Sequence, residues 1–284
     1  MSQKLVSILE VYDYETAQRT VLEKFDHRIE APEWTPDGKS LIYNAKGHIY
    51  QFSLADKKSI QINTANCDSC NNDHVVSPDG KALAISGGCG EAVVSRIWIL
   101  PIGGGWPKMI TEKYPSYLHS WSPDGKKLAY CAEREGAYNI YTIEIAETTL
   151  ENKLTDTPAL DDGPEFSPEG DKIWFHSVRS GLAQIWKMNS DGSKQEQVTF
   201  DNEWNSWFPH ISPDGKKIVY LAFHADDVEP DKHPADKNVA IRELDPASGS
   251  TTTLIELFGG QGTINVNSWA PDNKQFAFVS YQYQ

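Results

Sequence analysis

The chain is short of positive charge. Its 284 residues include 26 Lys and Arg against 40 Asp and Glu, which gives a formal net charge of −14 and a pI near 5.0. Nucleic acids and anionic membrane surfaces bind clustered cations, so this balance argues against both as the main partner. No apolar run approaches the roughly 18 residues that a membrane-spanning helix needs. We therefore expect no nucleic-acid partner and no membrane insertion.

The N-terminal segment also lacks the features of a secretion signal. MSQKLVSILEVYDYETAQ has no sustained apolar region and no small-residue cleavage site after one. As the sequence stands, the expected location is the cytoplasm. A chain whose signal had been removed would look the same and would be periplasmic.

Cysteine is scarce, with four residues in the chain. Four are too few for a disulfide scaffold in a chain this long. Cys67 and Cys70 form a lone CxxC outside any βαβ context, and we expect Cys89 on the same rim. Free thiols are the favoured state. The alternative is a structural zinc whose fourth ligand would be His74 or Cys131.

What the sequence does have is a turn motif of Pro, an acidic residue and Gly that recurs six times. Pro fixes φ in such a turn, and Gly accepts a positive φ. The sixth copy ends in Asn273, the non-Gly residue that best tolerates this conformation. The copies are Pro36-Asp37-Gly38, Pro78-Asp79-Gly80, Pro123-Asp124-Gly125, Pro168-Glu169-Gly170, Pro213-Asp214-Gly215 and Pro271-Asp272-Asn273.

Each turn lies among short β-rich runs. An apolar residue precedes every Pro by two positions, and a second strand is expected directly after every turn, at residues 40–45, 81–86, 127–132, 172–177, 217–222 and 275–280. Third strands are expected at 48–54, 95–102, 138–145, 183–189 and 239–245, and fourth strands at 59–63, 108–111, 152–155, 196–200 and 252–257. Four short strands in about 45 residues are typical of a propeller blade.

The sixth copy supplies only two strands before the sequence ends. The missing pair is expected near the N-terminus, in LVSILEVYDYE and QRTVLEKF. We therefore predict a single all-β domain over residues 1–284, a six-bladed β-propeller with four antiparallel strands per blade. Its last blade combines about residues 262–284 with residues 3–26, so that the N-terminal strands close the ring without a free edge.

The repeats WSPDGKKLAY and FSPEGDKIWF resemble those of the TolB-like propellers. The resemblance covers essentially the whole chain and is especially close in FHSVRSGLAQIWKMNSDGSKQEQVTF and FGGQGTINVNSWAPDNKQFAFVSY. It implies the propeller fold. TolB proteins of the Tol-Pal system also carry an N-terminal α/β domain and an export signal, and this sequence shows neither.

A ligand site is expected at the mouth of the ring, called the top, where the strand before each turn begins. Three of the eight His residues occur there, in blades 2, 3 and 5, together with carboxylates and amides. Concave polar settings of this kind are where ligands bind, although a solvated channel lining would have the same composition. The predicted ligand-binding residues are Asn72, Asp73, His74, His119, Asp162, Glu165, Arg179, Trp207, His210 and Asn265.

A divalent metal ion in the channel is the alternative use of these His residues. His with carboxylate or amide oxygen suits Mn, Fe, Ni or Zn, and the candidate ligands are His74, His119, His210 and Gln261. The set is similar in residue type to that of the oligogalacturonate lyases, propeller enzymes that cleave uronate sugars by β-elimination with a bound divalent metal. That resemblance implies a charge-stabilising role for Arg179.

The loops that join second and third strands are expected at the same mouth. Arg134 and Arg179 lie on them and would clamp a ligand carboxylate or, as we favour, pair with an acidic residue of a neighbouring blade. The residues 222–239 of blade 5 are expected to form a long loop from which His224 and His233 reach the mouth. Trp207 would be either an exposed aromatic at the mouth or part of the core.

The favoured function is a non-catalytic binding module, and the alternative is a metal-dependent carbohydrate-active enzyme. The expected occupant of the mouth is a protein, a peptide, or a small acidic or sugar ligand. A monomer is expected.

Overall fold

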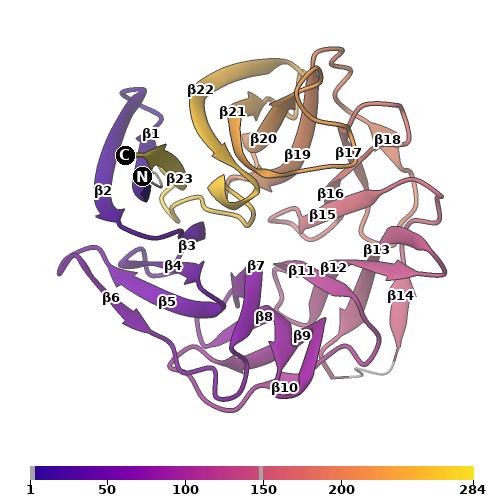
Figure 1. The fold of residues 1–284 in the computed structure, drawn as a ribbon. Coiled ribbons are helices and arrows are strands. Elements are labelled where there is room, and N and C mark those ends of the chain that lie inside the picture. The colour runs from indigo at the N-terminus through magenta and orange to yellow at the C-terminus, as the bar shows by residue number, and fades with distance from the viewer. Residues whose placement is uncertain (1–3, 147–149) are drawn as a thin grey trace.

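The computed structural model describes residues 4–146 and 150–284. Within this part of the chain, 23 strands form six antiparallel sheets that are arranged in a ring (Figure 1). The helical structure there is one short 3₁₀ turn, η1 (Gln261–Thr263). No helix in the described residues is long and apolar enough to cross a membrane.

Five blades follow the chain, each with its first strand at the centre of the ring and its fourth outside. Blade 1 contains β3 (Glu30–Trp34), β4 (Ser40–Ala45), β5 (His48–Ser53) and β6 (Lys58–Gln61). Blade 2 contains β7 (Ser69–Val76), β8 (Ala82–Cys89), β9 (Ala92–Pro101) and β10 (Lys108–Met109). Blade 3 contains β11 (Ser116–Trp121), β12 (Lys127–Arg134), β13 (Ala137–Glu144) and β14 (Glu151–Lys153).

Blade 4 contains β15 (Asp161–Phe166), β16 (Lys172–Ser177), β17 (Gln184–Asn189) and β18 (Glu196–Gln197). Blade 5 contains β19 (Trp204–Ile211), β20 (Ile218–His224), β21 (Ala235–Leu244) and β22 (Thr251–Gly260). Blade 6 contains β2 (Gln18–Phe25), β1 (Leu5–Asp13) and β23 (Gln275–Tyr283), in that order from the outside. The predicted six-bladed propeller is confirmed.

Blade 6 is closed by the N-terminal strands, as predicted. β1 pairs with β23 in an unbroken antiparallel register from Leu5 opposite Tyr283 to Asp13 opposite Gln275. The innermost segment of this blade is less regular and pairs with β23 through a single bridge between Trp269 and Phe276. Residue 3, which the prediction assigned to this blade, lies outside the described residues.

Four of the six turns share a set of side-chain hydrogen bonds in which a Ser or Thr hydroxyl and a backbone amide donate to the turn Asp. In the copy before β8, the Ser77 hydroxyl donates to Asp79 Oδ1 at 2.7 Å, and the Lys81 amide donates to the same oxygen at 3.1 Å. Gly80 has φ +70°, and Asn273 has φ +63° at the equivalent place in blade 6. The Asn therefore replaces Gly because it tolerates the left-handed conformation, as its position predicted.

Neighbouring blades are joined by buried polar side chains as well as by apolar packing. The Glu33 carboxylate of blade 1 accepts a hydrogen bond from the Val76 amide of blade 2 at 2.9 Å. The Trp121 indole of blade 3 donates to the Val75 carbonyl of blade 2, also at 2.9 Å. Glu33 lies three residues before the Pro of its turn, and Trp121 lies two residues before the Pro of its own turn. The repeated sequence therefore specifies contacts between blades as well as the strands within each blade.

The long blade 5 insertion is more ordered than predicted. Residues 222–239 were expected to form a loop, but β20 and β21 extend into this range, and residues 225–234 form the connection. Phe223 and Val239 pair across the two strands and are both buried, which explains the extension. Asp231, Lys232 and His233 of the remaining ten-residue loop line the cavity at the mouth.

Candidate ligand-binding site at the mouth of the ring

A cavity of about 760 Å³ opens where the innermost strands begin. Its walls come from the first residues of β7, β11 and β15, from the turn between β4 and β5, and from the blade 5 insertion. Gln261 of η1 and Asn265, which follows it, complete the wall. All six blades therefore contribute to one concave surface, as expected for a site built on a rigid scaffold.

Blades 3 and 4 meet at the cavity in an ion pair. Nε2 of His119 on β11 lies 2.9 Å from Oδ1 of Asp162 on β15, and both side chains are largely buried. Burial disfavours both charged forms, but the attraction between them outweighs it. The pKa of His119 is raised, and the pKa of Asp162 is lowered well below its usual range. Each group therefore favours the charged form of the other.

Blades 2 and 6 meet at a second buried carboxyl group. Asp73 of β7 is 4% exposed, and its Oδ1 accepts a hydrogen bond from Nδ2 of Asn265 at 2.7 Å. Burial raises the pKa of Asp73 to about 6, with nearby Asp162 adding to the rise and His119 opposing it. This carboxyl group therefore changes charge close to neutral pH.

The blade 5 insertion brings His233 to the cavity wall. Its ring packs against Trp207 and Phe208, at centroid distances of 4.5 and 5.6 Å. Phe208 has φ +53°, and its amide donates to Nδ1 of His176 at 3.4 Å. A Cβ on Gly163 would lie 2.9 Å from that same nitrogen, so only Gly fits there.

The structure brings six of the predicted residues to the cavity. They come from blades 2, 3, 4 and 6, and they are Asn72, Asp73, His119, Asp162, Gln261 and Asn265. The other predicted residues occupy positions between or within blades.

Glu165 and His210 join blades 4 and 5 away from the cavity surface. Nδ1 of His210 lies 2.9 Å from Oε2 of Glu165, and Oε1 of Glu165 accepts hydrogen bonds from the Ile211 amide at 2.7 Å and from Nδ2 of Asn267 at 2.6 Å. Glu165 is thus the blade 4 counterpart of Glu33. Both residues lie three positions before the turn Pro, and each accepts a hydrogen bond from a backbone amide of the next blade.

Trp207 and His74 are fully buried. Trp207 belongs to a hydrophobic core cluster, so it is part of the core and not an exposed aromatic side chain at the mouth. Neither ring nitrogen of His74 has a hydrogen-bond partner, and burial lowers the pKa of its imidazole to about 4. The His74 imidazole is therefore a neutral interior group.

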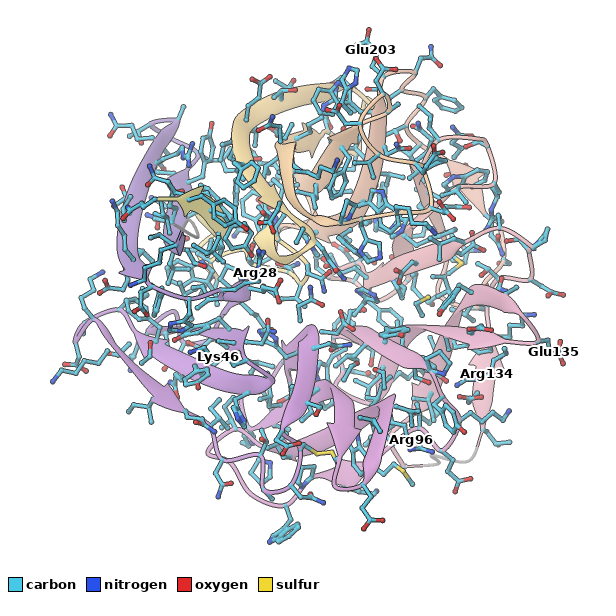
Figure 2. All side chains as sticks on the ribbon, viewed as in Figure 1. Arg28, Lys46, Arg96, Arg134, Glu135 and Glu203 are labelled. Atoms are coloured by element: carbon cyan, nitrogen blue, oxygen red, sulfur yellow. A yellow bond between two sulfur atoms is a disulfide. The ribbon has the colours of Figure 1, made fainter. Side chains whose placement is uncertain are left out.

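The two loop arginines pair with carboxylates, but within their own blades rather than across neighbouring ones. Nη2 of Arg179 lies 2.8 Å from Oδ2 of Asp161, the first residue of the same blade's inner strand. Arg134 pairs with Glu151 of β14 at 2.5 Å and lies towards the outer part of the ring (Figure 2). The expected neighbouring-blade partner was wrong because the inner and outer strands of the same blade lie within reach of each loop.

The four candidate metal ligands do not converge. His74 is enclosed between blades, His210 contacts Glu165, and His119 contacts Asp162. Over residues 4–146 and 150–284, no group of three His, Cys, Asp or Glu side chains could hold a metal ion. The residues present therefore do not fit the metal centre that the lyase resemblance implied.

The cysteines also differ from the expectation of free thiols. Cys67 and Cys89 form a disulfide that joins the strand β8 to the segment before β7. Cys70 and Cys131 are free and buried, and both border the cavity. Burial raises the pKa of the Cys70 thiol to about 12, which makes it a poor nucleophile.

Several cavity residues were missed by counting back from the turns. Glu30, Asn44, Lys46 and Tyr138 line the cavity from β3, from the β4–β5 hairpin and from β13. The hairpin position of Lys46 follows from the repeat, since second and third strands were expected to join at this mouth. Glu30 was hidden because a bulge between Glu30 and Glu33 shifts the register of β3 against β4.

The fold and the mouth together define a six-bladed propeller with a polar cavity at one end of the ring. A family profile described as TolB beta propeller domain matches residues 91–284, more than half of the chain. The chain belongs to this TolB beta-propeller family, which confirms the resemblance of its repeats.

Named relatives agree with this assignment. Protein Atu1656 of Agrobacterium fabrum is 42% identical over 276 residues, which cover 97% of this chain and 92% of that protein. A solved structure from Agrobacterium tumefaciens, provisionally described as TolB, is 41% identical with a TM-score of 0.93 and covers 99% of both chains. The Tol-Pal system protein TolB of Francisella tularensis is 26% identical over 152 residues, which are 52% of this chain and 34% of that protein.

An oligogalacturonate lyase solved in complex with manganese shares the fold. Its TM-score is 0.57 at 14% identity, and the match covers 90% of this chain and 74% of the lyase. At this identity the likeness concerns the fold alone.

Proposed function

We propose that this propeller is a non-catalytic binding module whose partner occupies the cavity at the mouth. The observation that carries the proposal is the cavity itself, in which polar groups from all six blades surround about 760 Å³. A volume of this size accommodates a small ligand or a few residues of a peptide. Membership of the TolB beta-propeller family supports an interaction role.

The proposed contacts are the predicted residues that border the cavity: Asn72, Asp73, His119, Asp162 and Asn265. His233 and Gln261 extend this set from the blade 5 insertion and from η1. Glu165, Arg179, Trp207, His210 and His74 would support the site by fixing the blades around it.

The proposed occupant is a segment of a protein or a peptide. The Francisella tularensis relative is named as a Tol-Pal system protein, and a role in a comparable assembly is part of the proposal. The Cys67–Cys89 disulfide supports an oxidising compartment such as the periplasm over the cytoplasm. A small acidic ligand is disfavoured, because Asp73 and Asp162 are both buried in the wall it would contact.

Site-specific photo-crosslinking in living cells tests the proposal. A photoreactive amino acid would replace Tyr138 or Lys232 at the mouth. Matched controls carry it at Lys126 or Lys216, beside the turns at the opposite ends of the inner strands. We expect defined adducts from the mouth positions and none from the controls. Adducts from the turn face alone, or equally from both faces, would show that the mouth is not the interface.

A further inference from the structure

Two Asn side chains in the cavity wall each lie beside an acid and carry an amide oxygen that has no hydrogen-bond partner. Asn265 donates its Nδ2 to Asp73, and its own Oδ1 is buried without a partner. Asn44 lies opposite Glu30 across β3 and β4, and its Oδ1 also lacks a partner. Both Asn residues are at least nine-tenths buried. A buried carbonyl oxygen without a donor is costly, so a donor supplied from the cavity would stabilise both.

The acids beside these oxygens share their neighbouring cations with other carboxylates, because His119 pairs with Asp162 and Arg28 pairs with Asp236. Burial raises the pKa of Glu30, and burial raises that of Asp73 to about 6. Arg28 lies near Glu30, but its guanidinium donates two hydrogen bonds to Asp236 at 2.8 and 2.9 Å. The lysines of the cavity, Lys46 and Lys232, are exposed at its rim. Four acids therefore border the cavity, Asp73 and Asp162 on what we call its floor and Glu30 and Asp231 around it, against the two rim lysines and His119.

The spacing of these acceptors suits an organic cation better than a metal ion. In the described parts of the chain, no three acidic, His or Cys side chains come together as metal ligands. The acceptors are instead distributed around a cavity of about 760 Å³. A guanidinium group carries five N–H donors in a planar fork and can bridge separated acceptors. Tyr117 and Tyr138 border the same space and offer aromatic surface to such a group.

We infer that the mouth binds a hydrogen-bond-donating organic cation, the guanidinium or ammonium group of a basic side chain presented by the partner. This inference rests on the proposed function, because it names the chemistry of the segment that enters the same cavity. Asp73 and Glu30 provide the countercharge, and the unpaired oxygens of Asn265 and Asn44 accept the remaining N–H groups.

The test compares L-argininamide with L-citrullinamide, which has nearly the same shape but no positive charge on its side chain. Binding of each to the full chain is measured by ligand-observed NMR at pH 7.5, with L-lysinamide as the ammonium counterpart. We expect argininamide or lysinamide to bind at least tenfold more tightly than citrullinamide. Equal affinities for the charged and neutral compounds would overturn the inference without any variant.

Two charge-removing variants locate the site. Asp73→Asn is expected to reduce argininamide affinity at least tenfold, whereas Glu203→Gln, an equal loss of charge at the outer edge of the ring (Figure 2), is expected to leave it unchanged. Asp162→Asn serves as a second floor variant if Asp73→Asn fails to fold. Equal effects of the floor and edge variants would overturn the assignment to the mouth.

Two further probes separate other occupants. Tighter binding of D-galacturonate than of argininamide would show an acid site, and displacement of argininamide by equimolar calcium chloride would show a metal site. Either result overturns the inference. If the photoreactive residue at Tyr138 captures a partner but argininamide and citrullinamide bind equally well, only the inference of a cationic group is refuted. The absence of mouth adducts would refute the proposed function itself.

Discussion

The buried imidazole of His74 predicts a pH-dependent loss of stability that one substitution should remove. Its ring is fully buried, has no hydrogen-bond partner, and has a pKa of about 4 in the folded chain against 6.5 when solvated. The unfolded chain therefore binds a proton that the folded chain excludes. The resulting stability is fully present above pH 6.5 and is lost as the pH falls towards 4.

The size of the effect follows from that difference. A shift of one pKa unit corresponds to about 1.4 kcal/mol, so the full loss is about 3 kcal/mol, of which about 2 kcal/mol is reached by pH 5. Other groups also titrate in this range, including Asp73, whose raised pKa acts in the opposite direction. The informative quantity is therefore the free energy of unfolding that the wild type loses on acidification minus the loss in a variant without His74.

The assay is urea unfolding of the wild type and of His74→Leu at pH 7.5 and 5.0. Leu has similar volume and no titrating group, and it removes two unsatisfied nitrogens, so the variant should fold. We expect the wild type to lose about 2 kcal/mol more than the variant between the two pH values. Equal losses in His74→Leu and wild type would refute the reasoning.

Three further changes have expected outcomes of their own. Glu165→Leu removes the acceptor that joins blades 4 and 5 and should cost about 2–4 kcal/mol in urea unfolding, with a smaller loss for Glu165→Gln; an unchanged midpoint would contradict this. Removing the disulfide by Cys67→Ser and Cys89→Ser, which are 22 residues apart, should cost about 3 kcal/mol, and reduction of the wild type should reproduce the loss. Gly80→Ala should cost about 1 kcal/mol because Gly80 has φ +70°, and an unchanged melting temperature would contradict the left-handed conformation assigned to it.

The blades were predictable because their determinants are local and repeated. A turn such as Ser77–Gly80 requires particular residues at fixed spacing, and the strand that follows it is apolar on both faces because both are buried. Six copies make the period visible without any knowledge of contacts between blades. The closing pair β1 and β23 was predictable for the same reason, since an incomplete copy at one end requires strands from the other.

The site was only partly predictable because it depends on register. Counting from the turns identified Asp73 and His119 correctly as residues near the mouth, but it could not tell which side of a strand faces the cavity after a bulge. β7 has such a shift between Cys70 and His74, and β19 has another between Trp207 and His210. These shifts place His74 and Trp207 inside the protein.

The meeting of the two chain ends has a mechanical consequence. The backbones of Lys4 and Gln284 exchange hydrogen bonds of 2.8 and 2.9 Å, and the two ends lie together in Figure 1. Because β1 and β23 are antiparallel, a force that pulls the two ends apart would break the hydrogen bonds between these strands one after another. The same blade supplies Asn265 to the mouth. Tension applied through the ends and occupancy of the cavity would thus act on one common blade.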